Sequence, residues 1–94
     1  MKLVELIQVR SFSENDRQHA IDMFNTLSLK GLNLPSQIKL FKSQTLAGDL
    51  NICLCWDSVE NHAFKTAFGE KLVSAFKHFG WISHSVWEPL KEII

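Results

Sequence analysis

Two side chains in the sequence have the chemistry of a general acid or base. His84 lies between Trp81 and Trp87 in an alternating run of residues, and imidazole titrates near neutral pH. Lys65 lies on the apolar arc of a predicted helix, where its cation could bind an enolate or a carboxylate. We therefore predict His84 and Lys65 as catalytic residues. The structural alternatives are a hydrogen-bonded histidine within the sheet and a lysine whose stem runs past the helix edge.

One carboxylate and several large apolar side chains are candidates for binding a small molecule. Glu5 interrupts an otherwise hydrophobic strand, so its carboxylate needs either an ion-pair partner or an open cavity wall. The tryptophans and the apolar residues of the second helix either fill the core or line a pocket. The predicted ligand-binding residues are Glu5, Trp56, Trp81, Trp87, Phe68 and Leu72.

The two cysteines do not form a recognisable metal site. Cys53 and Cys55 are two residues apart on a predicted strand, so they point the same way, about 7 Å apart. A disulfide between them would need strained geometry, and we expect reduced thiols. A metal site with His84 would lack a fourth ligand and the usual spacing. The sequence predicts neither a metal ion nor a cofactor.

The hydrophobic pattern predicts the elements that hold these residues. Alternating residues predict four strands, at 3–10, 37–43, 50–56 and 81–87. Apolar residues at helical spacing predict one helix from 14 to 30 and a second from Asp57 or Ser58 to Gly80. The resulting order predicts a ferredoxin-like α+β fold, with a four-stranded antiparallel sheet and both helices on one face.

Composition limits the classes of protein to consider. The 94 residues make one small domain, 1–94. Ten basic and ten acidic residues cancel, so no net charge draws in nucleic acid or an anionic membrane surface. The sequence has neither a run of ~20 apolar residues nor the pattern of a secretory signal. We expect a cytoplasmic protein that binds neither nucleic acid nor membrane.

The sheet is expected to have more apolar surface than two helices can cover. The predicted strands at 3–10 and 50–56 have apolar residues on both alternating sets, and two helices cover only one sheet face. The other face then needs a partner, most simply a twofold-related copy of the chain. We predict a homodimer formed through that sheet face.

The junction Leu54-Cys-Trp-Asp-Ser-Val-Glu60 is a hydrophobic strand that runs into Trp, an acidic residue and Ser before a helix. With the element order and the last strand ending in Val86-Trp87-Glu88-Pro89, it resembles the dimeric α+β barrel superfamily, which includes antibiotic-biosynthesis-monooxygenase-like proteins. The resemblance implies two ferredoxin-like subunits whose sheets form one barrel, with a small-molecule cavity in each subunit. Some members oxidise quinol-like or polyketide aromatics with O2 and without a metal.

This sequence departs from two branches of that superfamily at specific positions. Many monooxygenase-like members have a His where this chain has Lys65, and the haem-degrading residues fall on Lys65, Ala75 and Ile7. Haem degradation is therefore not expected. Two hypotheses remain: a cofactor-independent monooxygenase-like enzyme acting on a small aromatic or quinol-like molecule, and a non-catalytic dimeric module that binds a small molecule or has a regulatory role.

Overall fold

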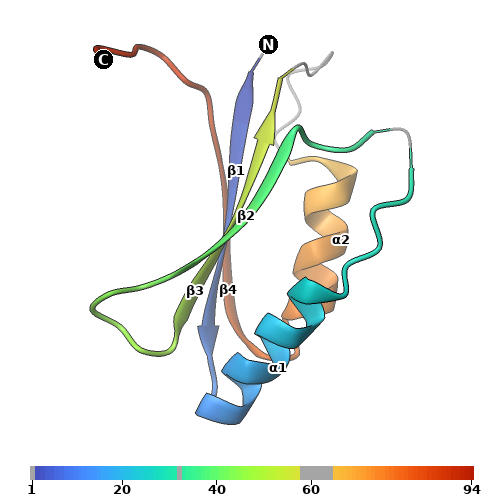
Figure 1. Ribbon diagram of the computed structural model, residues 1–94, viewed down its shortest axis with the longest axis vertical. Coiled ribbons are helices and arrows are strands. Elements are labelled where there is room, and N and C mark those ends of the chain that lie inside the picture. Colours follow the sequence, from blue (N-terminus) through green and yellow to red (C-terminus); the bar gives the residue numbers. More distant parts are fainter. Residues whose placement is uncertain (1, 32, 58–64) are drawn as a thin grey trace.

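The computed structural model of this protein describes residues 2–31, 33–57 and 65–94. Its two central strands alternate between buried and more exposed residues. Within these ranges the elements are β1 (Leu3–Ser11), α1 (Glu14–Asn25), β2 (Gln37–Lys42), β3 (Asp49–Trp56), α2 (Ala67–Phe76) and β4 (Gly80–Trp87). The strands form one antiparallel sheet in the order β2-β3-β1-β4, and both helices lie on the same side of it (Figure 1). The predicted ferredoxin-like α+β fold is confirmed.

The core lies between the sheet and the two helices. Every second residue of the central strands β1 and β3 is buried against the helices, as the two-residue period of a strand requires. From α2, Leu72 and Phe76 pack into this layer, and Ala20 joins it from α1. The sheet side of the core consists of Leu3, Glu5, Ile7, Val9, Leu50, Ile52, Leu54 and Trp56.

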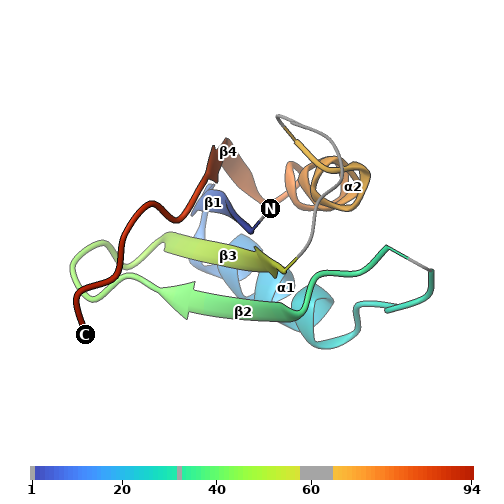
Figure 2. The same cartoon turned by 90° about the horizontal axis from the view of Figure 1, so that it is seen from above.

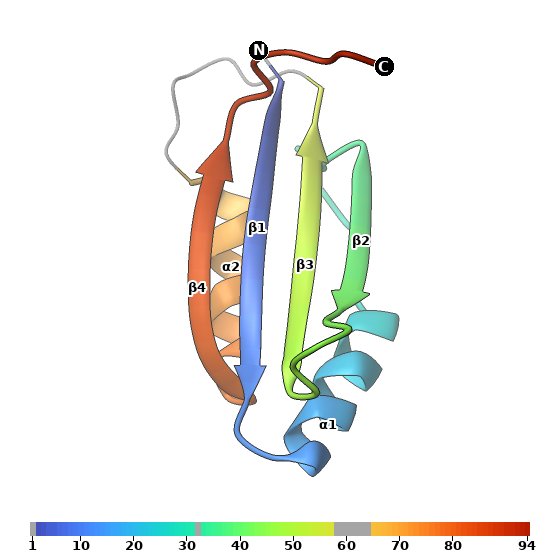
Figure 3. The same ribbon diagram turned by 90° about the vertical axis from the view of Figure 1, so that its left-hand side faces the viewer.

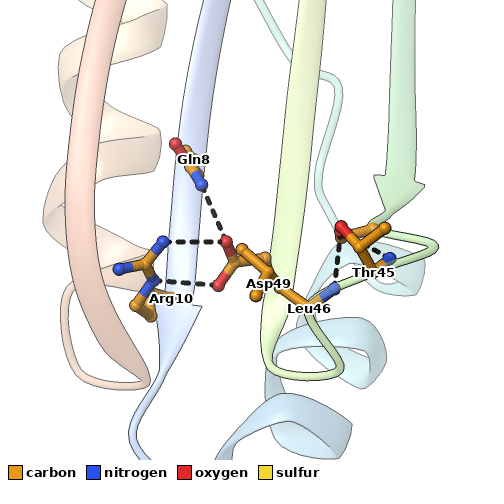
Figure 4. Close-up of polar contacts among 6 residues, drawn as sticks. Gln8, Arg10, Thr45, Leu46 and Asp49 are labelled. Atoms are coloured by element: carbon orange, nitrogen blue, oxygen red, sulfur yellow. Dashed lines mark hydrogen bonds and ion pairs between the residues drawn. The ribbon is translucent and has the colours of Figure 1, made fainter.

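The opposite side of the sheet, which we call the open face, presents the other alternating residues. Figure 3 looks onto this face, with α1 and α2 behind the sheet. Trp81 and Trp87 of β4 are 71% and 58% exposed there. The face also holds a polar group, in which Arg10 forms an ion pair with Asp49 at 3.1 Å and Gln8 donates a hydrogen bond to the same carboxylate (Figure 4). The open face is therefore mixed, with apolar and paired polar residues side by side.

The first helix is shorter than the sequence pattern predicts. α1 ends at Asn25 instead of residue 30. Thr26 caps its C-terminus: its backbone N–H and its hydroxyl both donate to the Met23 carbonyl, and the Leu27 N–H donates to the Phe24 carbonyl. A β-branched residue whose hydroxyl competes for a backbone acceptor favours a helix end.

The second helix also differs at both ends from the prediction. α2 begins at Ala67, with Thr66 as N-cap, and ends at Phe76. The cap expected at Asp57 or Ser58 is wrong for this helix, and Ser58 lies outside the described residues. Gly80, predicted to end the helix, instead begins β4. A Cβ at Gly80 would lie 2.3 Å from the Arg10 carbonyl oxygen, so a side chain there would clash with β1.

Neither α1 nor α2, the helices in the described ranges, is long and apolar enough to cross a membrane.

The chain that follows β4 runs on the side of the sheet away from the helices (Figures 1 and 2). Its apolar side chains Leu90, Ile93 and Ile94 are exposed. They extend the apolar surface on the side of the open face.

Candidate functional site

Glu5 is a fully buried carboxylate near the start of the central strand β1, with 0% of its surface exposed. The indole N–H of Trp56 donates to its Oε1 at 2.8 Å, and the hydroxyl of Thr66 donates to the same atom at 2.6 Å. His84 Nε2 lies 2.8 Å from the other oxygen, Oε2, to which the Thr66 backbone N–H donates at 3.4 Å. Glu5, Trp56, Thr66 and His84 together form what we call the Glu5 cluster.

The register of the sheet brings three of these residues together. Glu5 pairs with Leu54 of β3 and with Val86 of β4. Trp56 is two residues beyond Leu54, and His84 is two residues before Val86, so both lie on the same face as Glu5. Diagonal neighbours of this kind are within reach of long and aromatic side chains. The two strands beside β1 therefore each direct one polar ring at the carboxylate.

The N-terminus of α2 supplies the fourth member of the cluster. The Thr66 hydroxyl accepts the Gly69 backbone N–H at 2.9 Å and donates its own hydrogen to Glu5. One side chain thus caps the helix and binds the carboxylate. The positive end of the α2 dipole also favours a negative group at this position.

Gly69 lets the helix come this close to the carboxylate. A Cβ at this position would lie 2.2 Å from Glu5 Oε2 and 3.2 Å from His84 Nε2. The glycine itself is buried. Any side chain at residue 69 would therefore displace either the helix or the carboxylate, which makes Gly69 part of the construction of the site.

Thr66 and Gly69 were not among the site residues predicted from the sequence. The available signal was a threonine three residues before a glycine within an apolar helical pattern. Threonine is a good N-cap, and a glycine inside a helix costs about 1 kcal/mol relative to alanine, so its presence indicates a packing or functional reason.

The geometry fixes how His84 can act on a proton. His84 Nε2 faces Glu5 Oε2, so with an ionised carboxylate Nε2 carries the hydrogen and Nδ1 holds the lone pair of the neutral ring. Glu5 orients the imidazole and stabilises the imidazolium that would form when Nδ1 takes up a proton. The His84 side chain is 5% exposed. The carboxylate and the surrounding core therefore hold the imidazole in one orientation.

The structure brings together Glu5, Trp56 and His84, which the sequence analysis selected. The predicted need of Glu5 for a partner is met by His84. Phe68 packs edge-on against Trp56, with ring centroids 6.4 Å apart, and Leu72 belongs to the same core. These residues place an aromatic and aliphatic wall beside the polar cluster.

The other three predicted site residues do not join the cluster. Trp81 and Trp87 are on the open face of β4, because they are an odd number of residues from His84, which faces the helices. They therefore do not fill the core, and Trp81 lines a cleft of about 250 Å³ on the open face. Lys65 precedes the cap of α2 and is exposed. Its expected position on the apolar arc of a helix is therefore wrong.

The cysteines lie on the open face, on the other side of the sheet from His84. Cys53 and Cys55 are free thiols whose sulfur atoms are 4.0 Å apart. Burial raises the pKa of the Cys53 thiol, and the neighbouring Cys55 raises it further. A metal site shared with His84 is therefore ruled out by the alternation of the strands. Among the residues that the structure describes, no group of three or more His, Cys, Asp or Glu side chains could hold a metal ion.

Comparison with protein-family models, with curated proteins and with solved structures finds no match for the chain. The ferredoxin-like fold is established by the strand order and the placement of the helices. Membership of the dimeric α+β barrel superfamily stays a prediction from the sequence.

Proposed function

We propose that this chain is a small-molecule enzyme in which His84, oriented by Glu5, removes a proton from an aromatic or quinol-like substrate. The observation that supports the proposal is the 2.8 Å contact between His84 Nε2 and Glu5 Oε2 in a buried setting. Trp56 and Phe68 supply flat apolar surfaces beside it, which suit an aromatic ring.

The reaction class we propose is a monooxygenation that needs no bound cofactor. Loss of a proton gives an electron-rich carbanion or phenolate, which can react with O2 directly. In balanced form, an activated CH2 group and O2 give a carbonyl group and one water. The substrate supplies the electrons, and His84 takes up the first proton and returns it to the departing oxygen.

We also propose that two copies of the chain pair through the open face. Phe41, Trp81 and Trp87 are more than half exposed on it, and large exposed apolar residues that gather on one face favour an interface. Clefts of about 330 and 250 Å³ flank the Arg10–Asp49 pair on this side of the sheet. A second copy would cover these residues. The Glu5 cluster would remain on the helix side of the sheet, away from the interface.

A second candidate function is a non-catalytic binding or regulatory module with the same dimeric architecture. The observation that favours it is the near-complete enclosure of the cluster, in which Glu5 is 0% and the His84 side chain 5% exposed. A carboxylate that already has this many donors is also a stable structural group. In this case the Glu5 cluster holds α2 on the sheet and takes no part in chemistry.

Oxygen consumption separates the two candidates. The wild-type protein, incubated with a panel of hydroquinones and phenolic compounds, is expected to consume O2. His84→Gln keeps a donor for Glu5 but has no basic nitrogen, and should lower the rate by a factor of about 10² or more. His19→Ala, on the exposed side of α1, is the matched control and should leave the rate unchanged.

The melting temperature of each variant shows whether a lower rate reflects lost folding. No O2 consumption by the wild type across the panel would refute the enzyme. A ligand that then raises the melting temperature in a dose-dependent way would support the binding module. Unchanged oxygen consumption in a folded His84→Gln protein would refute the role of His84.

A further inference from the structure

A cleft of about 720 Å³ lies at the opposite end of the sheet from the Glu5 cluster. It is formed where β1 ends, α1 begins and the loop joins β2 to β3, and its lining includes Ser11, Arg17, Lys42 and Gly48. Ser11 is six residues beyond Glu5 on β1, which separates the two sites by ~20 Å. The volume is within the usual range of small-molecule sites.

Positive charge in this cleft is not neutralised by the described part of the chain. Arg17 and Lys42 both line it, and neither forms an ion pair with a carboxylate in residues 2–31, 33–57 or 65–94. Glu14 is the one acidic residue among those that line the cleft. The local charge is therefore positive, although the whole chain is neutral.

Two residues of the cleft lining have a side-chain polar atom that is buried without a hydrogen-bond partner in the described residues. The atoms are Ser11 Oγ and Arg17 Nε. Buried donors without partners cost free energy, and most such groups in proteins are satisfied. The other hydroxyl groups nearby are already engaged: Ser13 Oγ caps α1, and Ser43 Oγ accepts the N–H groups of Thr45 and Leu46. Ser11 and Arg17, which both line the cleft, thus each have a polar atom that the described residues leave without a partner.

Separate elements hold these groups in place. The Ser11 backbone N–H donates to the Gly48 carbonyl at 2.9 Å, which ties the end of β1 to the β2–β3 loop. The Arg17 backbone N–H donates to the Ser13 carbonyl in the first turn of α1. Lys42 is the last residue of β2. The three residues thus come from three different elements, each held by its own backbone hydrogen bonds.

We propose that this cleft binds a small molecule through a phosphate group. The planar guanidinium of Arg17 matches two phosphate oxygens, Lys42 supplies a second cation, and the Ser11 hydroxyl supplies a neutral donor. The volume exceeds that of a phosphate ion, so the site also has room for an organic part. Glu14 repels the phosphate group and therefore weakens binding of the bare ion.

The test is a titration of the full chain, followed by nuclear magnetic resonance, with inorganic phosphate and with ribose 5-phosphate at low ionic strength. Both should shift amide signals of residues 11–17 and 42–48, and ribose 5-phosphate should bind more tightly. Arg17→Gln should weaken binding about tenfold or more. Lys42→Gln changes an exposed residue and tests the same site if Arg17→Gln fails to fold.

Two further variants make the outcome specific. Lys39→Gln, on the same strand but outside the cleft lining, should leave binding unchanged. Glu14→Gln should tighten the binding of inorganic phosphate. The proposal is overturned if the wild type shows no saturable shift below about 10 mM, if Lys39→Gln weakens binding as much as Lys42→Gln, or if both cleft variants bind normally.

Discussion

Gly69 shows at the scale of one residue how the site constrains the sequence. In an ordinary helix, replacing glycine with alanine is stabilising by about 1 kcal/mol. Here the added Cβ would lie 2.2 Å from Glu5 Oε2. We expect Gly69→Ala to lower the free energy of unfolding by about 2 kcal/mol. Urea denaturation measures this, with Ser74→Ala on the exposed side of α2 as the control. An unchanged or higher stability would contradict the close approach.

Asp49 gives the fold a predictable response to acid. Its hydrogen bond with Arg10 holds the pKa of the carboxyl below its ordinary value of 3.8. A carboxyl whose pKa is lower in the folded state contributes stability above its unfolded pKa and loses it as the pH falls through the folded pKa.

Stability should therefore fall between about pH 5 and pH 2, and Asp49→Asn should make this decline shallower. Urea denaturation at several pH values measures both curves. Glu92→Gln, in the exposed segment after β4, serves as the control. Parallel curves for the wild type and Asp49→Asn would show that the pair with Arg10 does not stabilise the fold.

Residue types predicted part of the Glu5 cluster. A carboxylate in a hydrophobic strand and a histidine in a strand both required partners, and the structure makes them partners of each other. Their pairing could not be predicted, because it depends on the register of β1 with β4. The separation of Trp81 and Trp87 from His84 could have been predicted, since residues an odd number apart on a strand face opposite ways.

At the scale of elements, the strands followed from the sequence more closely than the helix ends. Alternation over several residues marks a strand clearly, and each strand limit lies within one residue of its predicted position. A helix end depends on one capping side chain and on what that side chain contacts. Thr66 caps α2 while it binds a carboxylate from a strand distant in sequence, and no local pattern shows that contact.

Thr66 is therefore expected to matter more than an ordinary cap. Thr66→Val removes both the cap and a donor to a buried carboxylate, and we expect it to lower the free energy of unfolding by about 2–3 kcal/mol. Thr66→Ser keeps the hydroxyl and should cost much less. Thermal and urea denaturation compare the two variants. Equal losses in both would show that the methyl group of Thr66, and not its hydroxyl, supports the site.

At the scale of the whole molecule, the proposed pairing of two copies depends on the open face. Leu6 lies on this face near the middle of β1, between Cys53 and Ser85 on the neighbouring strands. If two copies pair there, Leu6→Glu would place two charges in a dry interface and should weaken dimerisation about 100-fold or more.

Light scattering with size-exclusion chromatography measures the mass of the wild type and of the variant. Lys30→Glu, exposed and remote from the open face, should remain a dimer. A wild-type protein that stays monomeric at micromolar concentration would refute the pairing, and the Glu5 cluster would then belong to a monomer.

The position of Glu5 also has a consequence for how the protein opens. Its carboxylate lies in a central strand and holds the first turn of α2 through Thr66. If the helix detached alone, the buried carboxylate would lose both the hydroxyl and the backbone N–H donor of Thr66, which is costly. Helix and sheet should therefore lose their structure in one cooperative step, so that amide hydrogens of α2 exchange with solvent as slowly as those of β1.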